Sequence, residues 1–121
     1  MSVSIKELEM KAARQTIQLA DREMGLNNSQ VASALGVSQR SLYRYKKLEN
    51  APSPDVRERL SMLREITQLL NEIFSENDDQ LHWLYNTVPL LRGQRPIDLI
   101  QKGELEKVIS ILAGVHSGAF G

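Results

Sequence analysis

The chain has 121 residues, of which 41% are hydrophobic, 25% charged and 5% aromatic, a composition typical of a soluble globular protein of one ordinary or two small domains. It has no cysteine, which excludes disulfides, cysteine-ligated zinc and a thiol nucleophile and favours a reducing cytoplasm. The net charge is zero, but residues 1–47 carry +4 and residues 48–121 carry −4. Since aromatic residues are few, packed helices and an all-α fold are expected, with a basic N-terminal part.

Two other classes of protein are disfavoured by what the sequence lacks. No run approaches the roughly 18 apolar residues of a membrane helix, and the N-terminus does not have the pattern of a signal peptide, so we expect a cytoplasmic protein without a membrane partner. The two histidines, His82 and His116, stand beside no metal-ligand motif, nucleophile or phosphate-binding loop. We therefore expect no catalytic residue, no metal and no cofactor, and a protein that is not an enzyme.

The first predicted element is an amphipathic helix from Ser4 to Met24, which Gly25 ends. Its apolar residues recur at spacings of three and four, as they do on one face of a helix. These residues are Ile5, Leu8, Ala12, Ala13, Thr16, Ile17, Ala20 and Met24. The pattern predicts that this face covers a core.

Residues 27–47 are typical of a helix-turn-helix, two short helices separated by Gly36. Ala32 is small where the second helix must cross closely, and Gly36 readily takes the positive φ that the sharp turn requires. Val37 is expected to fill the corner under the turn. Ser38 then caps the second helix, and Leu42 and Tyr45 point from it into the core.

The opposite face of that second helix has the chemistry of a DNA-reading surface, because an α-helix fits the major groove and Arg and Gln pair well with guanine and adenine. Three residues are predicted to read bases, helped by Ser38 and Ser41: Gln39, Arg40 and Tyr43. Three others are predicted to bind phosphates: Arg44, Lys46 and Lys47. The alternative is an ordinary solvated basic stripe on a helix-turn-helix that does not bind DNA.

The segment 51–53 is the predicted boundary between a helix-turn-helix domain, residues 1–50, and a helical domain, residues 53–121. Ser53 followed by Pro54 indicates the start of a long helix that reaches about Phe74. One stripe of this helix is apolar: Val56, Leu60, Leu63, Ile66, Leu70 and Ile73. It is interpreted either as core or as a dimer interface, and the two readings are compatible.

Shorter elements follow in the acidic half. Asn77 is predicted to cap a helix that carries Trp83 and that Pro89 ends, and residues 89–96 form a turn-rich connector. Pro96 begins a short helix that stops at Gly103. A final amphipathic helix uses Leu105, Val108, Ile109 and Leu112, and the chain then runs out in small, unpatterned residues.

The motifs of this half resemble a known family. Leu81-His-Trp83-Leu84, Pro89-Leu-Leu-x-Gly93-x-x-Pro96-Ile-Asp-Leu99-Ile, then Gly103, Val108, Leu112 and the end Ser-Gly118-Ala-Phe120-Gly are similar to the toxin-binding domain of Xre/MbcA/ParS-type antitoxins. The helix-turn-helix also resembles the Xre-like one of that family. The resemblance covers approximately residues 27–121, with the parts in the same order.

This resemblance implies a type II antitoxin that binds a cognate RES-domain toxin, an NAD-degrading enzyme, and represses their shared operon by binding operator DNA. We also expect a homodimer, since the apolar stripe of the long helix could serve as a dimer interface. It implies that the C-terminal segment lies over the catalytic cleft of the toxin. The expected toxin contacts are Trp83, Arg92, His116, Ser117, Gly118, Ala119, Phe120 and Gly121. Two alternatives stay open: a terminus that frays without a role, and a free-standing dimeric repressor that has no toxin.

Overall fold

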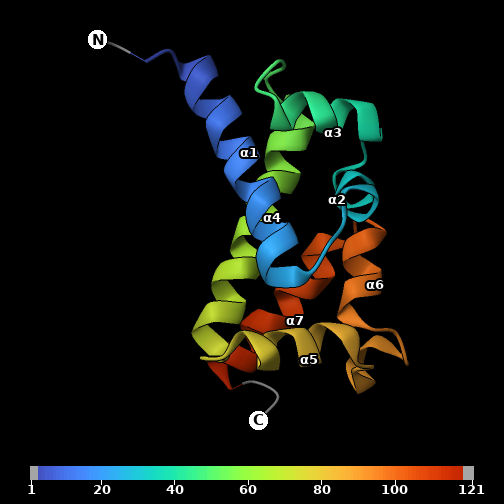
Figure 1. The fold of residues 1–121 in the computed structure, drawn as a ribbon. Coiled ribbons are helices and arrows are strands. Elements are labelled where there is room, and N and C mark those ends of the chain that lie inside the picture. The colour runs from blue at the N-terminus through green and yellow to red at the C-terminus, as the bar shows by residue number, and fades with distance from the viewer. Residues whose placement is uncertain (1–2, 119–121) are drawn as a thin grey trace.

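The structure, a computed structural model, describes residues 3–118, and within that range the chain is helical and has no strand (Figure 1). The all-α expectation is confirmed. The elements in chain order are α1 (Ile5–Met24), α2 (Asn28–Leu35), α3 (Gln39–Lys46), α4 (Pro54–Ile73), α5 (Asn77–Tyr85), the 3₁₀ helix η1 (Pro89–Leu91), α6 (Pro96–Gln101) and α7 (Leu105–Ser117). None of these helices is long and apolar enough to cross a membrane.

Helix α4 is the centre of the molecule, with α1 on one side and α7 on another (Figure 1). The start of α4 contacts the second turn of α1 through Arg57 and Glu9, and Arg64 then reaches Thr16, so the two helices run in the same direction. Helix α7 also runs in the same direction as α4, because its last turn contacts the end of α4 at Glu72. Helix α5 lies across the end of the molecule where α4 stops.

The apolar stripe of α4 forms the core of the protein. Val56, Leu60, Leu63, Ile66 and Leu70 are each at most 7% exposed and belong to one cluster with buried residues from every other α-helix. The interpretation of this stripe as core is therefore confirmed. Because residues from both sides of the predicted boundary at 51–53 share that cluster, the division into two domains stays a prediction.

The predicted core face of α1 is wrong over its first two turns. Ala13, Ile17 and Met24 are buried as expected, but Ile5 and Leu8 are 76% and 55% exposed, and Ala12 is exposed as well. The reason is the length of the neighbouring helix: α4 begins opposite Glu9, so the first turns of α1 extend past the body of the molecule, as Figure 1 shows. Periodicity predicts which face of a helix is apolar, but it does not predict how far along the helix a neighbour covers that face.

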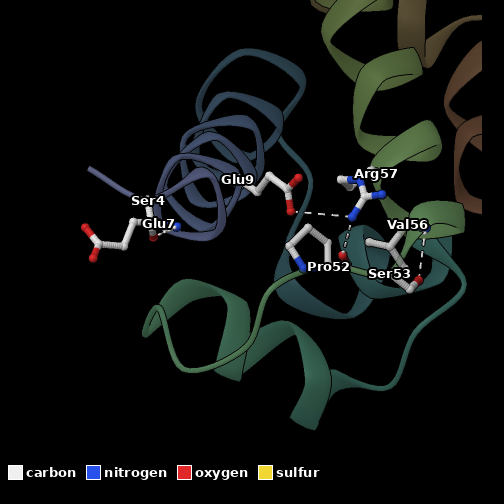
Figure 2. Close-up of polar contacts among 7 residues, drawn as sticks. All are labelled: Ser4, Glu7, Glu9, Pro52, Ser53, Val56 and Arg57. Atoms are coloured by element: carbon white, nitrogen blue, oxygen red, sulfur yellow. Dashed lines mark hydrogen bonds and ion pairs between the residues drawn. The ribbon is translucent and has the colours of Figure 1, made fainter. Parts of the chain in front are cut away.

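Polar contacts fix the starts of α1 and α4 (Figure 2). Ser4 and Ser53 accept hydrogen bonds from the backbone N–H three residues on, at 3.1 and 3.3 Å, and the predicted cap at Ser53 is confirmed. Arg57 Nη1 lies 3.4 Å from Glu9 Oε2 and donates to the Pro52 carbonyl at 3.2 Å. One side chain thus holds α1, α4 and the segment before α4 together.

The C-terminal elements differ from the prediction at several ends. Glu76, not Asn77, is the N-cap of α5; the Asn77 amide instead donates to the Glu23 carbonyl at 3.1 Å and so ties α5 to α1. Helix α5 ends at Tyr85, while Pro89 begins η1. Helix α7 continues through the small residues to Ser117, where a run without periodicity suggested a loose tail.

Tyr85 joins α5 to the end of α1, because its hydroxyl donates to the Met24 carbonyl at 2.8 Å. We expect Tyr85→Phe to lower the free energy of unfolding by about 1 kcal/mol, the usual net value of such a hydrogen bond. Burial raises the pKa of Tyr85, an effect that nearby Arg95 partly opposes. Because the folded pKa exceeds the unfolded one, the stabilisation by the neutral phenol is full below about pH 10 and is lost as the pH rises through the folded pKa.

Urea denaturation at pH 7 and above pH 10 measures this difference. The exposed Tyr43 provides the control, since Tyr43→Phe removes a hydroxyl that makes no hydrogen bond within residues 3–118. Equal stability of the Tyr85→Phe and Tyr43→Phe variants at pH 7 would contradict the assigned role of Tyr85.

Candidate functional site

The turn between α2 and α3 is built as the sequence predicts. Asn27 caps α2 reciprocally with Gln30, at 2.9 and 2.8 Å. Gly36 has φ +70 and ends α2, after which the Val37 N–H donates to the Ala32 carbonyl at 3.0 Å. A left-handed backbone at this position strains any residue with a Cβ, which explains the glycine.

Helix α3 begins at a cap and is pinned to the core. The Ser38 hydroxyl accepts from the Ser41 N–H at 3.0 Å, as predicted for an N-cap. Leu42 and Tyr45 are 1% and 8% exposed, and Ala32, under the crossing of the two helices, is 3% exposed. These packing predictions are confirmed, and they fix which face of α3 is turned outward.

The outward face of α3 holds the residues that the sequence predicts for DNA contact. Four of them are exposed on the helix or at its end: Gln39, Arg40, Tyr43 and Lys47. Ser38, the N-cap of the helix, is exposed as well. Three predicted residues are half-buried: Ser41, Arg44 and Lys46. The structure therefore brings all eight predicted residues onto one short helix and its cap.

The basic residues of α3 keep their charge available. Between Asn27 and Leu48 there are four basic residues and no acidic one: Arg40, Arg44, Lys46 and Lys47. Within residues 3–118 none of the four forms an ion pair with a carboxylate. Their partners are neutral: Lys46 Nζ donates to Asn28 Oδ1 at 2.9 Å, and Lys47 Nζ lies 5.4 Å from the centre of the Tyr43 ring. An uncompensated positive face of this kind attracts phosphate.

One hydrogen bond occupies two of the residues that the sequence predicts near a base, Ser38 and Ser41. The Ser38 hydroxyl donates to the Ser41 hydroxyl at 3.1 Å, so the two serines satisfy one another at the start of α3. Gln39, Arg40 and Tyr43 make no side-chain hydrogen bond within the described residues and stand free for contact. The side chains of these three residues are therefore freer to form new contacts than those of the two serines.

Arg59 of α4 has a structural role that was not predicted from the sequence. Its guanidinium donates to the Ala34 carbonyl at 3.3 Å and lies between two turn glycines. A Cβ would lie 3.4 Å from Arg59 Nη1 at Gly36 and 2.6 Å from it at Gly103. Arg59 thus fastens the helix-turn-helix to the turn before α7. Only the two glycines gave a signal in the sequence, and they lie far apart from Arg59 along the chain.

The predicted toxin contacts Trp83 and Arg92 have different surroundings. Trp83, on α5, is half-buried and packs against the core, so part of its surface already has a structural role. Arg92 follows η1, is exposed and has φ +54, a left-handed conformation that costs a non-glycine residue energy. The neighbouring Leu90 is 56% exposed, so this corner presents an apolar and a basic side chain together.

The other predicted contacts lie at the end of the chain. His116 is exposed on the last turn of α7, with Nε2 3.3 Å from Glu72 Oε2. The Ser117 hydroxyl donates to the Gly114 carbonyl at 3.1 Å, and Gly118 ends the helix at φ +80. Ser117 and Gly118 are therefore the end of the helix and its cap, not part of a loose tail as the sequence suggested. Ala119, Phe120 and Gly121 lie outside the described residues.

Comparison with known proteins adds three similarities. The family model of the antitoxin Xre-like helix-turn-helix domain matches residues 10–65. Mycobacterial cidal antitoxin MbcA of Mycobacterium tuberculosis is 25% identical over 105 residues, which span 87% of this chain and 92% of MbcA. The probable mycobacterial cidal antitoxin Rv3188 of the same species is 29% identical over 99 residues, 82% of this chain and 84% of Rv3188.

The fold has a solved counterpart. A chain in the crystal structure of the M. tuberculosis MbcT-MbcA toxin-antitoxin complex matches this structure with a TM-score of 0.64 and 25% identity, over 89% of this chain and 96% of that chain. The similarity therefore includes the helices after the helix-turn-helix as well as the helix-turn-helix itself.

Proposed function

Since this chain is a homologue of the MbcA antitoxins and carries an Xre-like helix-turn-helix domain, we propose that it neutralises a cognate toxin by direct binding and represses its own operon. The observation that carries the proposal is the extent of the similarity, which covers nearly all of MbcA and of a chain in a toxin-antitoxin complex. A repressor that shared only the DNA-binding part would match over that part alone. In this proposal the protein acts in the cytoplasm by binding and has no catalytic role.

The proposed toxin is a RES-type enzyme that degrades NAD. Support comes from the resemblance of the C-terminal motifs, and the proposed contacts are the exposed end of α7 with its tail, Arg92 and the open part of Trp83. Expression of the protein encoded by the neighbouring gene should lower cellular NAD, and co-expression of this chain should restore it. Unchanged NAD together with growth arrest would indicate a toxin of another class.

In the proposed operator contact, some residues of α3 bind phosphates and others read bases. We expect Arg44→Ala or Lys47→Ala to weaken binding to every DNA sequence and to reduce the slope of log affinity against log salt by about one, because each change removes one phosphate contact. Arg40→Ala should instead reduce the preference for the operator over unrelated DNA by about tenfold or more, since it removes a base contact.

Titration of the DNA upstream of this gene, at several salt concentrations and beside a scrambled duplex, measures both effects. Lys11→Ala, an exposed change on α1, serves as the charge-matched control. If Lys11→Ala changed the salt slope as much as Lys47→Ala, the assignment of phosphate contacts to α3 would be wrong.

The second candidate function is a free-standing dimeric repressor. The family model matches only residues 10–65. The uncompensated basic face of α3 could bind DNA whether or not the C-terminal half binds a toxin. In both functions the chain binds DNA as a homodimer, with half-sites about one helical turn apart. Size measurement after co-expression with the neighbouring gene product separates them, because an antitoxin elutes with that product and a free-standing repressor elutes alone.

A further inference from the structure

A regular series of contacts links α1 to α4. Arg57 Nη1 lies 3.4 Å from Glu9 Oε2, and one heptad further along both helices Arg64 Nη1 donates to Thr16 Oγ1 at 2.8 Å. In each pair the residue on α4 is a cation and its number is 48 higher than that of its partner on α1. A third step of seven residues leads to Glu23, opposite Asn71, where α4 supplies no cation.

Glu23 is left without the partner that the series suggests. Its Oε2 atom is buried and has no hydrogen-bond partner within residues 3–118. Asn71 is engaged elsewhere, since its Oδ1 accepts from Gln80 Nε2 at 2.8 Å. Glu23 also lies in the last turn of α1, where the partial negative charge of the helix end opposes a carboxylate. A buried carboxylate oxygen without a partner is costly, and a cation would remove that cost.

A groove is present beside this carboxylate. It has a volume of about 420 Å³ and runs between α1 and α4, with the apolar Leu19 beside two acidic residues, Glu23 and Glu72. Arg64, Thr67, Gln68 and Asn71 complete the lining, and the guanidinium of Arg64 is engaged by the Thr16 hydroxyl. A lysine or arginine side chain is complementary to this lining, because it has an apolar stem and a cationic end. The groove therefore suits one long basic side chain from another molecule.

The groove also adjoins the segment proposed to meet the toxin. Glu72, at its rim, pairs with His116 at 3.3 Å, and His116 lies two residues before the cap that ends α7. A partner that contacts the end of α7 is thereby close to the groove.

We propose that the groove between α1 and α4 binds a lysine or arginine side chain of the toxin, whose cation pairs with the carboxylate of Glu23. This inference rests on the proposed antitoxin function. It adds a specific anchor separate from the C-terminal tail, and it assigns a function to Glu23 Oε2, which has no hydrogen-bond partner within residues 3–118.

The test compares Glu23→Gln with Asp21→Asn, which removes an exposed carboxylate two residues away on α1. Each full-length variant is measured alone by thermal unfolding, and in binding kinetics with the toxin that co-purifies with the wild-type chain. Glu23→Gln should raise the melting temperature of the free chain and weaken the complex about tenfold or more, mainly through faster dissociation. Asp21→Asn should change affinity less than threefold.

A higher melting temperature together with a weaker complex distinguishes a binding residue from a structural one. If Glu23→Gln lowered stability and affinity together, Glu23 would be a structural residue and the proposal would be overturned. Unchanged affinity would also overturn it. If the wild-type chain bound no toxin, the proposed function itself would fail, an outcome distinct from a Glu23→Gln variant that binds as tightly as wild type.

Discussion

Removal of residues 119–121 is expected to weaken toxin binding by about a hundredfold and to leave operator binding within twofold of wild type. Gly118 ends α7 with a left-handed backbone, so the truncated chain keeps every helix that the structure describes. The deletion removes Phe120, the proposed anchor of the tail. An aromatic anchor that fills a pocket commonly contributes 2–4 kcal/mol to binding, which is roughly thirtyfold to a thousandfold.

Two controls make this truncation informative. Phe120→Ala should reproduce most of the loss, and thermal unfolding should show that both variants are as stable as wild type. The measurements are toxin affinity, operator affinity and melting temperature on the same preparations. Retained toxin affinity would mean that the terminus frays without a role, whereas equal loss of both activities would mean that it is structural.

Leu63→Ala is expected to destabilise the whole molecule by about 3 kcal/mol and lower the melting temperature by roughly 10 °C. Leu63 is fully buried on α4, in the cluster shared by the helix-turn-helix and the C-terminal helices. Because that core is common to both halves, operator binding and toxin binding should disappear along the same thermal transition as the helical signal.

The matched control for the core is Ser61→Ala, an exposed change on the same helix, which should shift the melting temperature by no more than about 2 °C. If operator binding persisted in Leu63→Ala above the temperature at which toxin binding is lost, residues 1–50 would be an independent folding unit. That result would confirm the predicted domain boundary and contradict the shared transition.

The helix-turn-helix could be read from the sequence because each of its requirements is local. A positive φ at Gly36, a cap at Ser38 and buried residues three apart at Leu42 and Tyr45 depend on a few neighbouring residues. The outward face of α3, and with it the candidate DNA-binding residues, follows from the same spacing. Local chemistry therefore predicted which face of α3 is turned outward, but not that Ser41, Arg44 and Lys46 are half-buried.

Features that depend on distant parts of the chain were missed. The exposure of Ile5 and Leu8 depends on where α4 begins, and Arg59 acquires its role only when Gly36 and Gly103 come together around it. Asn77 was predicted to cap its own helix, but its amide is used by the end of α1. In each case the partner lies tens of residues away, and no periodic or motif signal links the two positions.

The end of α7 shows a related limit. The residues from Ser117 to Gly121 are small, uncharged and without periodicity, so the sequence suggested a loose tail there. Packing of α7 along α4, together with the His116–Glu72 contact, extends the helix to Ser117. The proposed tail therefore begins only after Gly118.

Growth of cells that express the neighbouring gene product tests the central claim most directly. Co-expression of the intact chain should restore growth, and the product should then co-purify with this chain. The Arg44→Ala variant should restore growth equally, since α3 is assigned to DNA. Growth arrest that persists when the intact chain is present in excess, with no complex recovered, would contradict the account.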